Sequence, residues 1–276
     1  MEAGQQFGEY ALRAARTYGA AADHYDRPQV GFWDRFGAAT VSRLGLSTGE
    51  NVLDLCCGAG ASALPAARAV GENGQVTGID VAEPLLALAR ARAAADGLTN
   101  VEFRLADATA TGLAAESFDA VLCVFGVFFA ADMPAFVANM WRLVRPGGVL
   151  AITVWGPGLF EPANTVFWES VRDVEPALYK AFNPWDEITT PELLAGLFAK
   201  AGVPRASTQA VAGTHNLDTP DGFWDVVLGS GYRSTVEALG AAKRDQLQAQ
   251  VLGELRARGV TALRTDVIYA TVRRPR

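Results

Sequence analysis

Asp54 and the two glycines that follow it have residue types and a spacing that suit ligand binding. Asp54 lies near the end of the apolar run 51–55, and the loop after it contains Gly58 and Gly60. Glycines let the backbone approach a ligand closely, and a helix that starts after such a loop offers unpaired N–H groups. The signal is weak alone, because Gly58, Gly60 and Ala63 also fit the loose dinucleotide pattern G-x-G-x-x-G/A. The neighbouring strand ends must decide the kind of ligand.

Two further carboxylates stand at the ends of the next apolar runs, 75–80 and 101–105. Asp80 lies about 20 residues beyond the glycine loop, where a carboxylate at the carboxyl edge of a parallel sheet can accept hydrogen bonds from both ribose hydroxyls. Asp107 is placed to meet an adenine amino group. Because Asp54 beside the loop would repel a pyrophosphate, the pattern favours a cationic ligand over an anionic one.

An alternation of strands and helices must position these side chains, and it predicts a parallel sheet. The expected strands are 51–55, 75–80, 101–105, 119–124 and 149–155. Helices 9–22 and 31–44 are expected before them, and helices 61–70, 84–96 and 133–144 between them. After 155, prolines and aromatic residues indicate an insertion, followed by helices 191–201, 222–229 and 236–258 and by late strands 205–215 and 265–273.

Asp54, Asp80 and Asp107, together with the turn Pro146-Gly147-Gly148, resemble class I S-adenosylmethionine-dependent methyltransferases, especially the small-molecule branch of ubiquinone and menaquinone biosynthesis. The resemblance covers residues 25–155. It implies a Rossmann-like α/β fold whose seven-stranded, mostly parallel sheet has the order 3-2-1-4-5-7-6, with helices on both faces and a helical lid made from insertions. It also implies S-adenosylmethionine as cofactor and a small molecule as methyl acceptor.

The same resemblance divides the chain into three segments. Residues 1–45 are expected to form helices that cover the cofactor pocket, residues 46–156 the Rossmann-like core, and residues 157–276 the lid insertions and the last strands.

Cofactor contacts follow from the resemblance as well. Gly58 and Gly60 would pass beneath the methionine part, Asp107 and Ala108 would flank adenine, and Val124 would lie near the sulfonium. The expected cofactor residues are Tyr25, Asp54, Gly58, Ala59, Gly60, Asp80, Val81, Asp107, Ala108 and Val124. One departure from the family pattern is Cys56, which replaces the first loop glycine and restricts the turn without filling the space over the other two.

Methyl transfer needs alignment and exclusion of water, plus a base when the nucleophile carries a proton. Of the two histidines, His215 at the end of a late strand is the candidate base. Aromatic residues beyond Trp155 are predicted to roof a pocket for a hydrophobic or aromatic acceptor, methylated on oxygen, carbon or nitrogen. They are Phe160, Phe167, Trp168, Phe182, Trp185, Phe223, Trp224 and Tyr232. The sequence has no metal-ligand spacing, which disfavours a metal-dependent mechanism.

Two other function classes stay open. A relative that keeps the cofactor site without transferring methyl, as a cyclase or a binding module, would share every feature above. A nicotinamide-dependent oxidoreductase would share the first half of the fold, although Asp54 speaks against it.

Composition excludes further classes of partner. The 24 Lys and Arg residues are outnumbered by 30 Asp and Glu, and the net charge of −6 argues against nucleic acid. The chain lacks an apolar run of about 18 residues and a secretory-type N-terminus, so no membrane span and a cytoplasmic location are expected. Three cysteines are too few for a disulfide framework. A homodimer is one assembly that the sequence allows.

Overall fold

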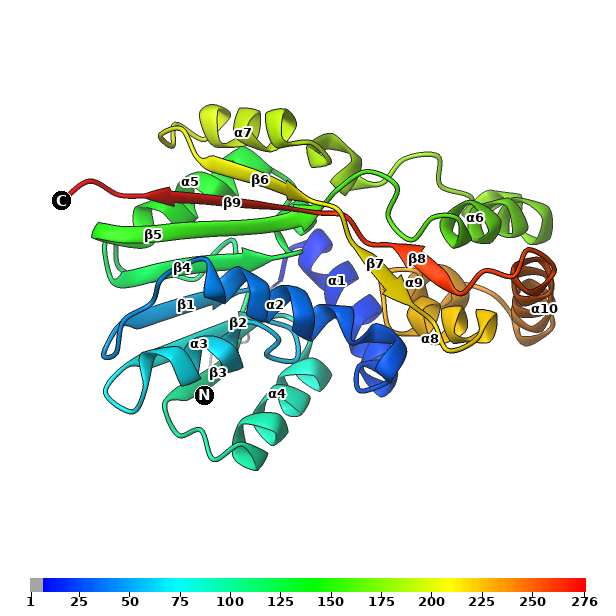
Figure 1. Cartoon of the computed structure of the whole chain (residues 1–276), viewed down its shortest axis with the longest axis horizontal. Coiled ribbons are helices and arrows are strands. Elements are labelled where there is room, and N and C mark those ends of the chain that lie inside the picture. Colours follow the sequence, from blue (N-terminus) through cyan, green and yellow to red (C-terminus); the bar gives the residue numbers. More distant parts are fainter. Residues whose placement is uncertain (1–6) are drawn as a thin grey trace.

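A seven-stranded sheet of order β3-β2-β1-β4-β5-β9-β6 forms the centre of the computed structural model, which describes residues 7–276. The strands are β1 (Asn51–Leu55), β2 (Gln75–Asp80), β3 (Val101–Leu105), β4 (Phe118–Val124), β5 (Val144–Trp155), β6 (Ser207–Val211) and β9 (Val267–Arg273). The first five are parallel, and β9 runs antiparallel between β5 and β6. The predicted strand order is confirmed, with β9 as its seventh strand (Figure 1).

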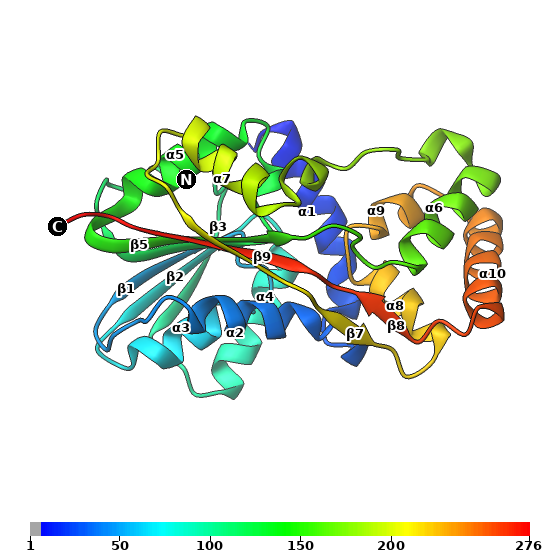
Figure 2. The same cartoon turned by 45° about the horizontal axis from the view of Figure 1, so that its top comes forward.

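Helices cover both faces of this sheet, as predicted (Figure 2). On one face lie α2 (Phe32–Ser42), α3 (Ala63–Val70) and α4 (Glu83–Ala95), and on the other α5 (Met133–Leu143) and α7 (Pro191–Lys200). The central strands are therefore buried on both sides, which explains why they are continuous apolar runs rather than alternating ones. In α4, Pro84 stands in the first turn and Gly97 follows the last, at φ +67°, where glycine has no Cβ penalty.

The first helix does not lie on a face of the sheet. Helix α1 (Glu9–Ala21) crosses its carboxyl edge, near the ends of β4 and β5, and is joined to α2 by the short turns η1 (Ala22–His24) and η2 (Pro28–Val30). We call residues 9–42 the N-terminal cover. Residues 1–6 of the predicted segment 1–45 lie outside the described residues.

The last third of the chain departs from the prediction in detail. The single strand expected at 205–215 is two strands, β6 and β7 (Thr214–Asn216), and β7 pairs with β8 (Ala262–Arg264) in a separate two-stranded sheet. The break falls at Gly213, where a Cβ would lie 2.4 Å from the carbonyl oxygen of Thr265, so that only glycine fits. The helix expected at 236–258 is likewise divided, into α9 (Arg233–Glu237) and α10 (Ala241–Ala257).

A helical subdomain stands beyond the carboxyl end of the sheet and contains α6 (Ala163–Val174), α8 (Phe223–Leu228), α9 and α10 (Figure 1). Its interior is aromatic: Phe167 and Phe223 are fully buried, and the ring of Phe167 stacks on Tyr232 at 4.7 Å between centroids. Within residues 7–276, no helix is both long enough and apolar enough to cross a membrane.

Candidate functional site

A cavity of about 230 Å³ opens at the carboxyl ends of β1, β2 and β4, and residues of α1 form part of its wall. We call it the strand-end cavity. Most of the predicted cofactor residues line it: Tyr25, Gly58, Ala59, Asp80, Val81, Asp107, Ala108 and Val124. This location follows from the fold, because ligands of open α/β sheets bind outside the carboxyl ends of the strands.

Asp80 is fixed in the cavity wall by backbone donors. Its Oδ2 accepts a hydrogen bond from the N–H of Gly58 and its Oδ1 one from the N–H of Ala82, each at 2.9 Å. Burial raises the pKa of Asp80, and the hydrogen bonds from Ala82 and Gly58 oppose that rise. Each carboxylate oxygen can accept more than one hydrogen bond, so Asp80 keeps acceptor capacity toward the cavity.

Asp107 stands on the loop after β3. Its Oδ1 accepts hydrogen bonds from the N–H of Thr109 at 2.8 Å and from the Thr109 hydroxyl at 2.7 Å. This Asx-type turn orients the carboxylate and leaves Oδ2 for other donors. Ala108 and Thr109 continue the wall beside it.

The glycine loop adopts left-handed backbone at three positions. Cys56, Gly58 and Gly60 have φ values of +60°, +52° and +85°. Cys56 is thus a non-glycine residue in a conformation that favours glycine, and its side chain is accommodated by Gly126 after β4. A Cβ on Gly126 would lie 2.4 Å from the Cβ of Cys56. Cys56 and Gly126 both line the cavity, although neither was predicted to.

Two predicted cofactor residues lie behind the wall rather than in it. Asp54 is fully buried, and its Oδ2 accepts a hydrogen bond from the Ser62 hydroxyl at 2.7 Å. Its Oδ1 has no hydrogen-bond partner among residues 7–276. Burial raises the pKa of Asp54 to about 7. Gly60 faces α3, since a Cβ there would lie 3.1 Å from Cγ of Leu64. Both residues therefore support the glycine loop on the side away from the cavity.

Aromatic rings from the N-terminal cover and the β4 end complete the cavity. Tyr25 stacks parallel to Trp33 at 5.9 Å between centroids, Trp33 meets Phe125 edge-on at 5.6 Å, and Tyr18 meets Phe129 edge-on at 5.4 Å. Only Tyr25 was predicted. Helical spacing offered a signal for Tyr18 alone, because Ala11, Ala14 and Tyr18 lie on one face of α1, but that spacing does not say what the face covers.

The predicted acceptor lid does not reach this cavity. None of its aromatic residues lines the described cavity wall. Trp168 of α6 and Trp224 of α8 are buried in the helical subdomain, whereas Phe182 is 55% exposed. The physical reason for part of this set is that Phe167, Trp168 and Tyr232 pack on one another and form a core of their own.

His215, the predicted base, is also placed elsewhere. It lies on β7, where its ring packs edge-on against Phe32 at 5.2 Å, and it is absent from the cavity wall. Burial lowers the pKa of His215. A half-buried, packed imidazole outside the cavity has no contact through which to take a proton from an acceptor. Within residues 7–276, no three His, Cys, Asp or Glu side chains are grouped to hold a metal ion.

Comparison with known proteins agrees with this geometry. Residues 52–148 match the family model described as a methyltransferase domain. The chain is 35% identical to aklanonic acid methyltransferase DauC of Streptomyces sp. (strain C5) over 148 residues, which cover 54% of this chain and 67% of that protein. It is 30% identical to nocamycin O-methyltransferase of Saccharothrix syringae, over 75% of this chain and 68% of that protein.

A solved structure shares the fold over nearly the whole chain. It is phosphoethanolamine N-methyltransferase 2 of Haemonchus contortus in complex with phosphomonomethylethanolamine and S-adenosylhomocysteine, with a TM-score of 0.60, 18% identity and coverage of 98% of this chain and 61% of that one. The sheet order, the match over residues 52–148 and the two curated relatives agree with one another. The chain belongs to the class I S-adenosylmethionine-dependent methyltransferases that act on small molecules.

Proposed function

We propose that the strand-end cavity holds S-adenosylmethionine and that the aromatic rings of the N-terminal cover hold a hydrophobic or aromatic acceptor beside it. The observation that carries this proposal is the placement of Asp80 at the end of β2 and Asp107 after β3 in the wall of one cavity, together with the glycine loop that follows the adjacent strand β1.

The charges of the wall suit this cofactor. Asp80 and Asp107 line the cavity, whereas the described wall contains no Lys or Arg that would neutralise a pyrophosphate. A cofactor with a sulfonium and an ammonium group fits such a wall better than a dinucleotide does. Asp80 would accept hydrogen bonds from the ribose diol, and the main chain at Ala61 and Ser62 would offer donors to the carboxylate.

The bound cofactor would supply an electrophilic methyl group for in-line displacement. The chain's own residues would align the acceptor and exclude water, with Val124 and Phe125 at the β4 end and Trp33 and Tyr25 above them. Burial raises the pKa of Tyr18 and of Tyr25, and no Lys, Arg or His lines the described wall, so the strongest bases that the wall offers near neutral pH are the carboxylates of Glu9, Asp80 and Asp107. We therefore expect an acceptor that is nucleophilic without help, such as an amine, an acidic phenol or a stabilised carbanion.

Incubation with methyl-labelled S-adenosylmethionine and a panel of phenols, quinones and amines, followed by mass analysis of the products, tests the transfer. Once an acceptor is found, Trp33→Ala should raise its KM by about tenfold or more and change the affinity for S-adenosylhomocysteine much less.

Trp168→Ala is the matched control, because Trp168 is a buried tryptophan outside the cavity. Equal effects of the two substitutions on the acceptor KM would show that stability, not the aromatic wall, determines acceptor binding. Tight cofactor binding with no labelled product from any acceptor class would favour a relative that does not transfer methyl.

A further inference from the structure

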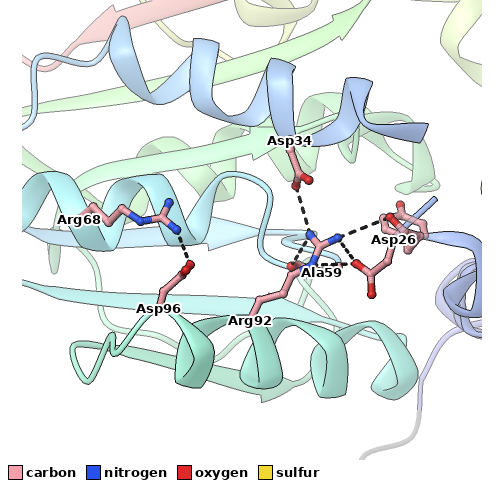
Figure 3. A network of polar contacts seen from close by, with 7 residues as sticks. Asp26, Asp34, Ala59, Arg68, Arg92 and Asp96 are labelled. Atoms are coloured by element: carbon pink, nitrogen blue, oxygen red, sulfur yellow. Dashed lines mark hydrogen bonds and ion pairs between the residues drawn. The ribbon is translucent and has the colours of Figure 1, made fainter. Parts of the chain in front are cut away.

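Arg92 connects three regions that are far apart in sequence: its own helix α4, the N-terminal cover and the glycine loop (Figure 3). Its Nε donates to Oδ1 of Asp26 at 3.1 Å, and its Nη2 also contacts Asp26. Its Nη1 donates to Oδ1 of Asp34 at 3.1 Å and to the carbonyl of Ala59 at 3.4 Å. Nη2 further donates to the carbonyl of Tyr25 at 3.4 Å. One guanidinium therefore joins α4, the turn before η2, α2 and the glycine loop.

Each of these partners is a cavity residue or the chain neighbour of one. Ala59 and Tyr25 line the strand-end cavity, and Arg92 binds their carbonyls. Asp26 follows Tyr25, and Asp34 follows Trp33, the second ring of the stacked pair. Arg92 itself does not line the cavity. Arg92 binds the backbone of two wall residues and the side chains that follow two wall residues in the chain, from outside the cavity.

The geometry requires an arginine. A planar guanidinium with five N–H donors can meet two carboxylates and two carbonyls at once, whereas a lysine ammonium is a single point charge with three donors. The side chain of Arg92 is 23% exposed, and its two carboxylate partners are mostly exposed, so each ion pair alone contributes little and is screened by salt. The set acts together because all its members share one guanidinium.

We propose that Arg92 is a positioning residue for cofactor binding: it latches the N-terminal cover onto the glycine loop and so keeps Tyr25 over the strand-end cavity. This inference rests on the proposal that the cavity holds S-adenosylmethionine. If the latch is released, the closed arrangement is populated for only a fraction of the time, and the apparent dissociation constant rises by the inverse of that fraction.

Arg92→Met keeps the length and apolar stem of the side chain and removes every donor. We expect it to raise the dissociation constant of S-adenosylhomocysteine about fivefold, equivalent to about 1 kcal/mol, mainly through faster dissociation. Arg68→Met is the matched control, because Arg68 pairs with Asp96 in an exposed ion pair that does not involve the cover. It removes the same charge and should leave the affinity within a factor of about two.

Two readouts separate a latch from general support of the fold. Asp34→Asn should also weaken binding, and the double variant with Arg92→Met should bind no more weakly than Arg92→Met alone, because the two changes remove one interaction. High salt should speed dissociation of the ligand from the wild type and leave the Arg92→Met rate nearly unchanged, since only the former has an ion pair to screen. If Arg92→Met fails to fold, Asp26→Asn and Asp34→Asn carry the same comparison.

The rate of trypsin cleavage of the ligand-free proteins measures how often the N-terminal cover opens. Cleavage after Arg13 and Arg16, which are exposed on α1, requires local opening of that helix and should be faster in Arg92→Met than in the wild type or Arg68→Met. Unchanged cleavage together with affinity within twofold of the wild type would overturn the latch. Failure of the wild-type protein to bind S-adenosylhomocysteine would instead overturn the proposed function, and the cleavage comparison would still decide whether Arg92 holds the cover.

Discussion

Asp80 is the side chain whose replacement should most affect cofactor binding. In Asp80→Asn the shape is kept, but the charge is lost and one oxygen becomes an amide donor. Two hydrogen bonds from the ribose diol to a charged acceptor are worth about 1.5–3 kcal/mol each, so even partial loss should reach about 1.4 kcal/mol and weaken S-adenosylhomocysteine binding at least tenfold.

Asp80 also has a structural role that adds to this cost. It is largely buried and accepts hydrogen bonds from the N–H groups of Gly58 and Ala82. Asp80→Ala would leave both N–H groups without their acceptor, which costs about 1–3 kcal/mol of stability for each one that water does not reach. The asparagine variant keeps one acceptor and is the better test.

Calorimetric titration with S-adenosylhomocysteine measures the effect, with the melting temperature of each ligand-free protein recorded beside it. Asp96→Asn is the matched control, because it removes the same charge at the other end of α4, where Asp96 pairs with the exposed Arg68. NADH serves as the control ligand and should not bind tightly. Unaltered S-adenosylhomocysteine binding by a folded Asp80→Asn protein, or tight NADH binding by the wild type, would refute the reasoning.

Two further predictions concern residues away from the cavity wall. Burial raises the pKa of Asp54 from 3.8 to about 7, so between these values the folded protein keeps a proton that the unfolded chain has released, and stability falls as the pH rises through this window. Asp54→Asn removes that loss, so the free energy of unfolding of the variant minus that of the wild type should rise by about 2 kcal/mol from pH 5 to pH 8, as measured by urea unfolding. A difference that does not change with pH would place the pKa of Asp54 near its ordinary value. His215→Ala should lower the melting temperature through its lost contact with Phe32 and leave the methyl-transfer rate unchanged; a large fall in kcat with intact cofactor affinity would restore it as a base.

The strand ends and their carboxylates could be predicted because they depend on local pattern. Apolar runs of β length give the central strands, and the side chains just after those strands must meet at one edge of a parallel sheet. Asp80, Asp107 and Gly58 follow that rule, and the structure places all three in one cavity. The two ends of α4 could be predicted from local sequence as well, since Pro84 marks its first turn and Gly97 follows its last.

The covering of the cavity could not be predicted in the same way. Aromatic residues are good at filling a core as well as a pocket, and composition does not tell the two apart. Phe167 of α6 and Phe223 of α8 are buried in the core of the helical subdomain. Trp33 and Tyr18, in helices before the sheet, line the cavity instead. Arg92 was missed for a related reason, because its partners Asp26 and Asp34 are brought to it by tertiary folding alone.

The contact between Cys56 and Gly126 constrains the order in which this loop can change. With a side chain at position 56, a methyl group at 126 would lie 2.4 Å from its Cβ, so Gly126→Ala is blocked while Cys56 is present. Cys56→Gly removes the nearest obstacle and relieves a non-glycine residue at φ +60°, but a Cβ at 126 would still lie 2.8 Å from Sγ of Cys123. Alanine can therefore enter at 126 only after position 56 has lost its side chain and the sulfur of Cys123 has moved or been replaced. Two positions that are 70 residues apart in sequence therefore restrict each other's substitutions.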